Sequence, residues 1–380
     1  MTRDELLGRA SAMVPVLRER AARAEELRQI PPETVIDLKA SGLIRIGNPA
    51  KYGGYADVDV DATYDVGWEL GRGCGSTSWC YSLWAVHNWW IGHFPEKAQH
   101  EFFAAGPDTL FSSGLNPTGG KAEPTEGGFR LSGRWAFSSG CDAASWAMVA
   151  VLGPGRPGIT WLLLPRPDYE IVDTWFAAGL RGSGSKDLVV SDAFVPVHRT
   201  LNPDCAGEDD RTGWELHGRP SYRVPLRCII GWDLVSPLIG IAQGAVDEFT
   251  ARLRGTSGPG RTAEFVPVQM RLAEAAAEVD AARTVHRTAI REMLDRSAGG
   301  DSFTDLDRVR YRRDKAFVVK LCVQAVNRLF EAGGAHAIYS TEPLQRFHRD
   351  AHSLSHHAAL GWDVAAEQFG RVALGLRPTI

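Results

Sequence analysis

Apolar residues recur at helical spacing through roughly the first hundred positions of the chain. Over residues 4–29 they are separated by steps of three and four, which places them on one helix face. Pro31 and Pro32 end this helix, and Gly42 is a suitable residue to follow the next one. We predict an all-helical region over residues 1–108, with helices at 4–29, 32–41, 61–71, 76–94 and 95–104.

The pattern changes near Thr109, where short apolar runs alternate with Gly, Pro and Asp. Runs such as WAMVAVL and ITWLLLP have strand length and hairpin spacing. The segment GPGRPG at 153–158 fits GxGxxG, but a strand-like run follows it where a dinucleotide-binding loop needs a helix. We interpret it as a hairpin turn. These features predict a β domain, a barrel or sandwich, over residues 109–205.

Helical spacing returns after a polar, Gly-rich stretch at 203–222 that we interpret as a linker. Four long segments with turns between them predict a four-helix bundle over residues 206–380. The fold class is therefore α+β and mostly α, in the order helical domain, β domain, helical bundle. The four predicted helices cover residues 231–254, 266–297, 305–333 and 344–374.

Composition and charge exclude several classes of partner and place the protein in the cytoplasm. The 380 residues carry 42 basic and 46 acidic side chains, a net charge of −4, which gives no footprint for nucleic acid or an anionic membrane. The N-terminus MTRDELLGRA lacks the apolar core of a signal peptide. No apolar run approaches the roughly 18 residues of a membrane span. The cysteines form no CxxC pair, which favours reduced thiols in a cytosol.

Tryptophan is unusually frequent, and four of the twelve lie within one stretch of twelve residues, 79–90. On the predicted helix, Trp79, Leu83, His87 and Trp90 share a face. A histidine among apolar residues is most often a core histidine. It is also how a general base with a pKa near neutral would be placed beside a flat aromatic substrate, and spacing alone leaves both interpretations open.

Two serine pairs, FSSG at 111–114 and FSSG at 137–140, lie at predicted strand ends. Their hydroxyls and free N–H groups can form hydrogen bonds with the edge of a polar heterocycle. Serine and glycine are also common in turns, which explains the two motifs equally well. His352 and His356 are four residues apart, as metal ligands often are, but HExxH and a third ligand in register are missing. We predict no metal site.

Several motifs, in order, resemble the acyl-CoA dehydrogenase fold over residues 5–375. They are GLRGSGS at 179–185, DLVVSDAFVP at 187–196, EAGGAHAIYSTEPLQR at 331–346 and the RDA at 349–351. The main dehydrogenases of that superfamily carry a glutamate base in the helix after RDA. Here that position corresponds to about Ala358, and the sequence has no carboxylate between Asp350 and Asp363. Removal of a thioester α-proton by that route is therefore not expected.

Three segments are more similar to the oxygenase components of two-component, reduced-flavin-dependent monooxygenases such as p-hydroxyphenylacetate hydroxylase and seco-steroid hydroxylase. They are AVHNWW at 85–90, WAFSSGCDAASWA at 135–147 and LQRFHRDAHSLSHH at 344–357. The resemblance implies diffusible reduced FMN or FAD from a separate NAD(P)H:flavin reductase, and a homotetramer. With O2 the flavin would form a hydroperoxide that hydroxylates a phenolic or polyketide-like aromatic substrate. An N- or S-oxygenase, an acyl-CoA dehydrogenase-like flavoprotein with an unusual base, and an inactive flavin-binding protein remain alternatives.

The resemblance also implies roles for individual residues. Ser138 would contact N5 of the flavin, and residues near 261–269 and 333–334 would reach the flavin phosphates of a neighbouring subunit. Arg181 and Arg227 are weaker phosphate candidates, and His356 receives no role. The expected catalytic residues are His87, Ser113, His352 and His357, and the expected substrate contacts are Trp79, Leu83 and Trp90. The expected cofactor contacts are Trp135, Ser138, Ser139, Arg181, Ser183, Ser185, Arg227, Phe265, Gln269, Gly333 and Gly334.

Overall fold

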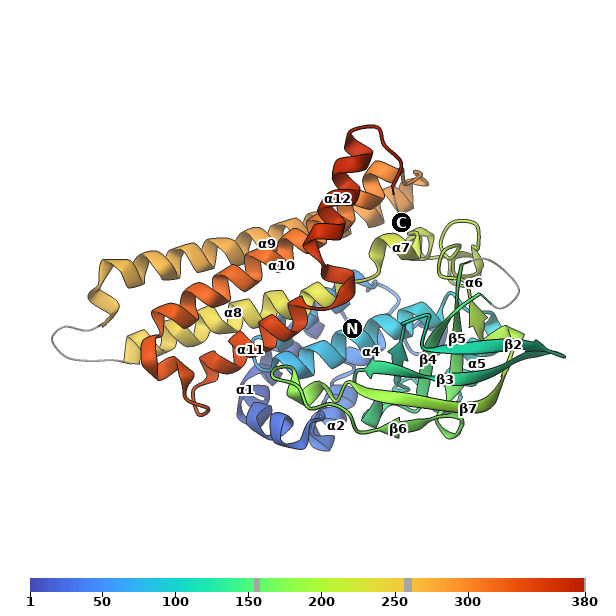
Figure 1. Ribbon diagram of the computed structural model, residues 1–380, viewed down its shortest axis with the longest axis horizontal. Helices are drawn as coiled ribbons and strands as arrows, with labels where there is room; N and C mark the ends of the chain where they lie inside the picture. The colour runs from blue at the N-terminus through green and yellow to red at the C-terminus, as the bar shows by residue number, and fades with distance from the viewer. Residues whose placement is uncertain (154–157, 256–261, 379–380) are drawn as a thin grey trace.

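The computed structural model describes residues 1–153, 158–255 and 262–378, and within them the chain runs through helices, a β region and helices again (Figure 1). The centre of the GPGRPG segment and Arg261 lie outside the described residues. The mostly helical α+β fold is confirmed. The N-terminal helices are α1 (Arg3–Leu27), α2 (Pro32–Ser41), α3 (Asp61–Gly71), α4 (Gly75–Ile91) and α5 (Glu96–Phe102).

Helix α4 lies at the centre of the molecule, and every one of its residues is buried. A helix that is apolar on all sides is buried on all sides, which accounts for its four tryptophans. Its N-cap residue is Cys74, and no side chain caps it. Ser76 and Thr77 lie in its first turn.

The β region is a sandwich of two four-stranded sheets. One sheet has the strand order β1-β4-β5-β8 and the other β2-β3-β7-β6. Strand β1 pairs with β4 in parallel, and Leu131, Val149 and Leu188 are among the residues buried between the sheets. The strands are β1 (Phe111–Gly114), β2 (Gly120–Thr125), β3 (Gly128–Ser138), β4 (Trp146–Leu152), β5 (Ile159–Pro165), β6 (Glu170–Val172), β7 (Lys186–Pro196) and β8 (Thr200–Leu201).

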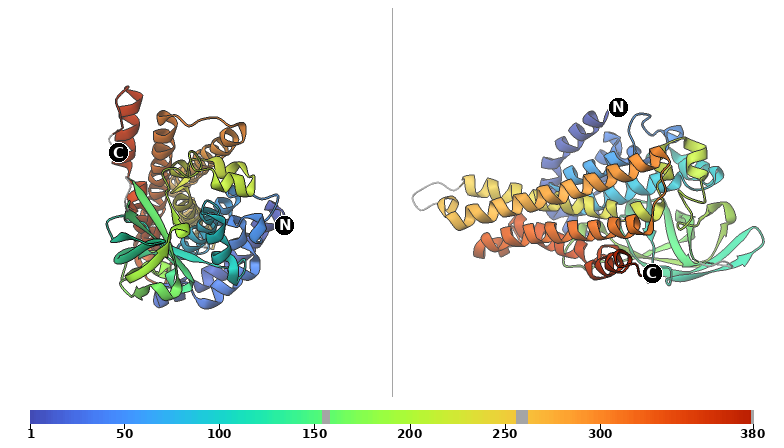
Figure 2. Two further views of the ribbon diagram at one scale, coloured as in Figure 1. Left: turned by 90° about the vertical axis from the view of Figure 1, so that its right-hand side faces the viewer. Right: turned by 90° about the horizontal axis from the view of Figure 1, so that it is seen from above.

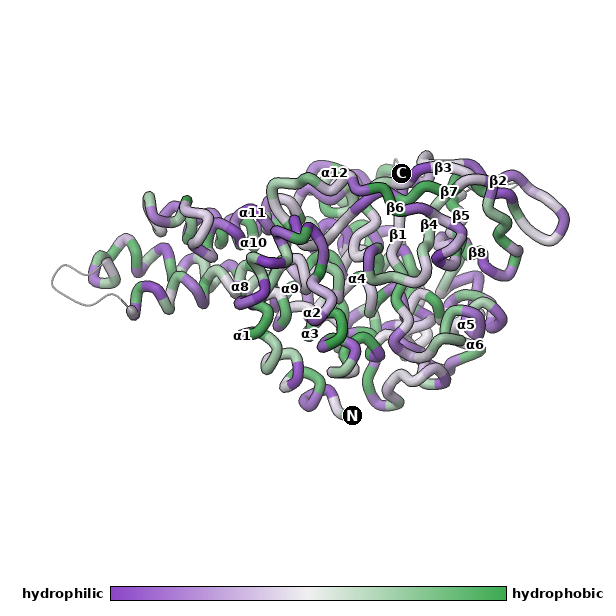
Figure 3. The backbone as a smooth tube through the Cα atoms, turned by 90° about the horizontal axis from the view of Figure 1, so that it is seen from below, coloured by the Kyte–Doolittle hydropathy of each residue, from purple (hydrophilic) through white to green (hydrophobic). Residues whose placement is uncertain are grey.

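The C-terminal helices form a bundle whose long members extend away from the sandwich (Figures 1 and 2). Along the projecting end, hydrophobic and hydrophilic residues alternate, as expected where only one face of each helix is covered (Figure 3). The helices are α8 (Trp232–Gly255), α9 (Val266–Gly299), α10 (Asp305–Ala332), α11 (Pro343–Ser355) and α12 (Trp362–Ala373).

The expectation of one helix over 344–374 is wrong, because the chain leaves the helix at His356 and His357. The His357 ring accepts a hydrogen bond from the backbone N–H of Ala359 and so begins the short 3-10 helix η11 (Ala358–Leu360). A side chain that caps a new turn competes with continuation of the old helix. The following helix α12 then projects from the bundle (Figure 1).

The stretch 203–222 is not a loose linker. It contains helix α6 (Thr212–His217), and Tyr222 is buried with its ring stacked on Trp89 at 5.5 Å between centroids. Apolar packing of one aromatic side chain outweighed the polar composition that suggested a linker.

The segment Leu226–Gly255 is long and apolar enough to cross a membrane, so the sequence expectation that no such stretch exists is wrong. The structure gives this segment another role, because 83% of its most apolar window is buried inside the protein. It includes α8, which is a core helix of the bundle and packs on α3 and α4.

Candidate functional site

His87 projects from α4 into a layer of aromatic rings. Its imidazole lies 4.6 Å from the ring of Phe111 and 4.6 Å from that of Trp90, measured between centroids. The Nδ1 atom is 3.2 Å from the carbonyl oxygen of Phe111, and Nε2 is 3.3 Å from the hydroxyl oxygen of Ser113. Because a carbonyl only accepts, Nδ1 carries the proton, and Ser113 donates its hydroxyl proton to Nε2.

The environment of His87 keeps the ring neutral. Burial lowers its pKa to about 3, against a small opposing effect of the Phe111 carbonyl. Of the two interpretations that the spacing left open, the one with a pKa near neutral is therefore not supported, because no charged partner compensates for the loss of solvent. At neutral pH His87 is therefore the neutral imidazole, with its one proton on Nδ1 and with Nε2 as an acceptor for the Ser113 hydroxyl.

A chain of three serine hydroxyls from the β region meets α4 at Trp79, about two helical turns before His87. The indole N–H of Trp79 donates to Ser139 Oγ at 2.8 Å, and Ser139 Oγ lies 2.7 Å from Ser185 Oγ. Ser185 in turn contacts Ser183 Oγ at 2.7 Å. These contacts join α4, the end of β3 and the loop before β7, and they bring together four residues that the sequence placed in the site.

Ser138 is held inward by an irregularity in the sheet. The pairing of β3 with β7 shifts register between Trp135 and Ser138, and Phe137 adopts the left-handed φ of 65° with its side chain 70% exposed. A bulge of this kind redirects the side chains that flank it. Ser138 Oγ is buried and has no hydrogen-bond partner among the described residues. Such a hydroxyl suits a flavin ring nitrogen, and it is the feature of this site that fits the expected cofactor best.

His357 brings a further imidazole to the same region from the bundle. Its ring lies 5.9 Å from that of Trp79. Since Nδ1 accepts from the Ala359 N–H at 3.2 Å, the neutral ring presents an Nε2–H. The His357 side chain is exposed to solvent. Desolvation and the positive charge of Lys315 lower its pKa, so the neutral form is favoured.

Several predicted residues lie elsewhere. His352 Nε2 lies 2.8 Å from Asn327 Oδ1, and its ring lies 4.4 Å from that of His348 at an angle of 50°, so both contacts are within the bundle. Trp135 is fully buried between the sheets with its N–H bonded to the Ala150 carbonyl, so it belongs to the core of the sandwich. Trp135 is therefore placed in the core and not against a cofactor, whereas a catalytic role for His352 stays a prediction.

Trp90 and Arg227 are also placed differently from the expectation. Trp90 packs between His87 and Trp161, which leaves it one layer behind the imidazole and makes it a support for that ring. Arg227 is paired with Asp204 on the surface, and this ion pair competes with any phosphate. Leu83 is buried on α4. Arg181 is exposed, two residues before Ser183 in the loop that leads to β7.

The remaining cofactor candidates lie at the far end of the bundle from the sandwich. Phe265 precedes α9 and is 55% exposed, and Gln269 is in the first turn of α9. Gly333 and Gly334 follow α10, and Gly334 has a φ of +63° with open space around it. In Figure 1 the start of α9 and the end of α10 lie on the side of the bundle that points away from the sandwich.

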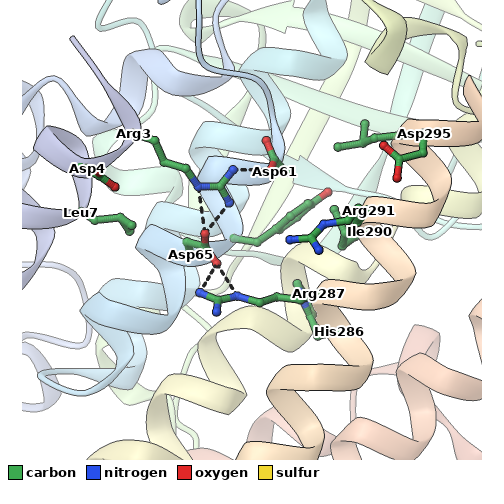
Figure 4. Close-up of a pocket in the computed structure, with 12 residues that line it drawn as sticks. Arg3, Asp4, Leu7, Asp61, Asp65, His286, Arg287, Ile290, Arg291 and Asp295 are labelled. Carbon is green, nitrogen blue, oxygen red and sulfur yellow. Dashed lines mark hydrogen bonds and ion pairs between the residues drawn. The ribbon is translucent and has the colours of Figure 1, made fainter. Parts of the chain in front are cut away.

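Three cavities among the described residues lie mostly away from these side chains. The first, about 510 Å³, lies between α1, α3 and α9, where Arg3 and Arg287 both pair with Asp65 (Figure 4). A second, about 540 Å³, lies between α9, α10 and Trp362. A third, about 210 Å³, touches the site through Ser183 and is otherwise lined by residues such as Trp84 and Gly140.

Known proteins with similar chains identify the family. Residues 234–362 match the family described as acyl-CoA dehydrogenase, C-terminal domain. The chain is 36% identical to the flavin-dependent monooxygenase oxygenase subunit HsaA of Rhodococcus jostii over 97% of this chain and 98% of that protein. It is 31% identical to the p-hydroxyphenylacetate 3-hydroxylase oxygenase component of Acinetobacter baumannii, over 98% and 90%.

The chain belongs to the oxygenase components of two-component flavin-dependent monooxygenases. The crystal structure of the 3-HSA hydroxylase from Rhodococcus sp. RHA1 superposes with a TM-score of 0.94 at 34% identity, covering 100% of this chain and 99% of that one. XiaF from Streptomyces sp., solved with FADH2 and glycerol, superposes with a TM-score of 0.89 at 27% identity, covering 100% and 97%. This oxygenase component therefore uses a reduced flavin that a separate reductase component supplies.

Proposed function

We propose that this oxygenase component hydroxylates a small phenolic or polyketide-like aromatic substrate, with O2 and with reduced FMN or FAD from an NAD(P)H:flavin reductase. Similar proteins support an aromatic substrate by their names, including a resorcinol hydroxylase of Rhizobium at 34% identity and the p-hydroxyphenylacetate 3-hydroxylase of Acinetobacter baumannii. The position where the resemblance places a dehydrogenase's glutamate corresponds to about Ala358, in η11, and the sequence has no carboxylate between Asp350 and Asp363, which disfavours an acyl-CoA substrate.

The observation that carries this proposal is the hydrogen bond from Ser113 to His87. Because the Ser113 proton points at His87 Nε2, the lone pairs of Ser113 Oγ are free to accept a proton from a phenol. If the phenol proton moved to Ser113 Oγ while the Ser113 proton moved to His87 Nε2, the electron density of the phenol ring would rise at the moment of attack. Such acid–base assistance typically contributes about 10²–10⁴ in rate.

The serine chain and Ser138 form the side of the site that would receive the flavin ring. Ser138 Oγ is free to bond N5, while Ser139, Ser183 and Ser185 fix the surrounding backbone. When bound, reduced flavin supplies the activated oxygen derived from O2. Trp79 and Leu83 exclude water from the adjacent volume, and a dry site protects reactive species from hydrolysis.

His357 completes the arrangement from the opposite domain. Its Nε2–H is a donor, and its position near Trp79 allows it to orient an oxygen atom between flavin and substrate. A neutral donor holds an oxygen without giving up a proton prematurely. These contacts favour His357 over His352 as the catalytic group that the bundle would contribute.

A homotetramer would bring the far end of one bundle to the flavin of another chain. Phe265 and Gln269 lie at the start of α9, and Gly333 and Gly334 follow α10, on the side of the bundle that points away from the sandwich (Figure 1). If they contact the adenylate tail, reduced FAD binds more tightly than reduced FMN, and Gln269→Ala weakens FAD alone. Equal affinities would favour FMN as the physiological cofactor.

The test is a coupled assay with NADH, a flavin reductase, flavin and a panel of phenols under ¹⁸O2. We expect one labelled oxygen atom in a hydroxylated product of at least one phenol. Release of hydrogen peroxide alone with every phenol, together with oxygenation of an amine or a thioether, would replace aromatic hydroxylation by N- or S-oxygenation.

A further inference from the structure

The loop that carries Ser183 and Ser185 is attached to helix α11 at three consecutive residues, 178–180. Arg349 donates to the Ala178 carbonyl at 2.6 Å, and Asp350 accepts from the Leu180 N–H at 2.6 Å. Between them, Gly179 packs so closely on α11 that a Cβ there would lie 2.2 Å from the Arg349 carbonyl oxygen. These contacts fix the loop against a rigid element of another domain.

Leu180 shows that the attachment imposes a conformation. Its φ is 49°, in the left-handed region that a branched side chain seldom adopts. Such a conformation persists only when its surroundings determine it, and strained residues of this kind cluster at functional sites. The Asp350 carboxylate supplies that restraint directly, because it bonds the N–H of the strained residue itself.

Asp350 also lies at the start of α4. It is buried, and a Cβ built on Gly75 would come within 2.8 Å of its second oxygen. Gly75 is the first residue of the helix that carries Trp79, and the N-terminal turn of a helix favours an anionic neighbour. One carboxylate thus contacts the bundle, the serine loop and the tryptophan helix, which are the three parts of the site.

We propose that Arg349 and Asp350 are positioning residues of the flavin site. They hold residues 178–180 so that the serines that follow meet Ser139, which in turn holds the Trp79 indole. Arg349 is itself fixed by Glu25 on α1, at 2.7 and 3.1 Å. The inference rests on the proposed function only in taking the serine chain as the flavin side of the site.

The decisive variants are Asp350→Ala, which removes the acceptor, and Asp350→Asn, which keeps an oxygen for the Leu180 N–H. Two properties are measured: amide hydrogen exchange of residues 178–185 without flavin, and anaerobic binding of reduced FMN and FAD. For Asp350→Ala we expect exchange of the loop and the reduced-flavin Kd each to rise about tenfold or more. Asp350→Asn should restore both to within about threefold of the wild type.

Asp65→Asn is the matched control. Asp65 is likewise a nearly buried carboxylate held by arginines, but it lies in the cavity of Figure 4 and has no contact with the loop. We expect this variant to lower the Tm and to leave loop exchange and flavin Kd unchanged. If Asp350→Ala does not fold, Arg349→Gln, which loses the bond to Ala178, is measured in its place with the same expectation.

The proposal is overturned if the folded variant shows loop exchange and reduced-flavin Kd within about twofold of the wild type, or if Asp65→Asn changes both as much. Failure of the proposed function has a different signature, because it appears in the wild type as absence of labelled product. Loop exchange is measured without flavin or substrate and is unaffected by that result.

Discussion

Ser112 and Ser113 are neighbours on β1 with opposite environments. Successive side chains on a strand point to opposite faces, so only one of the pair can reach His87. Ser113 does so, whereas Ser112 Oγ is buried without a partner among the described residues. This difference provides an internal comparison for the role of the hydroxyl.

Ser113→Ala removes the group that would receive the substrate proton. We expect the yield of hydroxylated product per NADH to fall by about 10²-fold or more, with hydrogen peroxide making up the difference, because acid–base assistance is lost. Binding of reduced flavin should not change. The measurement is product and peroxide per NADH consumed.

Ser112→Ala is its control, since the substitution removes a buried hydroxyl that has no described partner. It should leave coupling unchanged and should keep or slightly raise stability. Equal loss of coupling in both variants would assign the effect to strand packing and remove Ser113 from the proton path.

Asp350 gives stability a pH dependence whose sign can be worked out. Burial raises its pKa from 3.8 to about 7, opposed by the Leu180 N–H, Arg346 and Arg349 and reinforced by Glu25. Between about pH 4 and pH 7 the folded protein keeps a proton that the unfolded chain has lost. The stabilisation is therefore complete below pH 4 and is lost as the pH rises to 7, with a slope of at most about 1.4 kcal/mol per pH unit.

The amide side chain of the Asp350→Asn variant does not titrate. The free energy of unfolding of the wild type, minus that of the variant, should therefore decrease from pH 4.5 to pH 7. Urea titrations at several pH values measure it. A difference that stays constant or increases over this range would contradict a raised pKa for this carboxyl.

At the scale of secondary structure, the break between α11 and α12 gives His357 its position. One side chain begins η11 through Nδ1 and presents Nε2–H to the site. An unbroken helix, as the periodicity suggested, would have turned that ring along the helix surface. The local structure and the chemistry at this point therefore depend on the same imidazole.

Two substitutions separate these roles. Asparagine is a good capping residue, so His357→Asn should keep the Tm within about 2 °C of the wild type and lose most of the coupling. His357→Ala loses the cap as well and should be destabilised by about 1 kcal/mol. Thermal unfolding and the product yield per NADH distinguish them, and full coupling in the Asn variant would exclude a role for the ring.

The spacing of hydrophobic residues was sufficient to predict helices and strands that bury one face. It could not predict which side chains of different elements contact one another. Helices α1 to α4 and the strands follow from spacing, and the site residues Trp79, His87 and Ser138 from local motifs. The partner of His87 is Ser113, 26 residues away on another element, and only the fold brings them together. Trp135 and Trp90 lie in the same kind of tryptophan-containing motif as Trp79. Only the structure shows that Trp135 is buried between the sheets and that Trp90 lies behind the His87 ring.

At the scale of the whole molecule, the projecting end of the bundle is the part that one chain leaves uncovered. Phe265, Val266, Ile338 and Tyr339 are exposed there, which is unusual for a monomer unless the surface is covered by another protein. We expect light scattering to give the mass of four chains. The division of the chain into domains at residues 1–108, 109–205 and 206–380 stays a prediction.

Phe265→Glu places a charge in that apolar surface. The tetramer should dissociate at micromolar concentration, and binding of reduced FAD should weaken in parallel, because the same surface would hold the flavin tail of a neighbour. Val197→Glu, at a similarly exposed position on the sandwich, is the control and should change neither. Dissociation with unchanged FAD affinity would separate the interface from the flavin site.

The burial of α4 has an optical consequence. Trp79, Trp84, Trp89 and Trp90 are all shielded from water, and buried indoles emit at shorter wavelengths than exposed ones. That emission overlaps the near-ultraviolet absorption of flavins, so a flavin bound beside Trp79, as proposed, would accept excitation energy from the helix and dim its fluorescence. Cofactor binding could then be followed by titration without any label in the protein or its substrate.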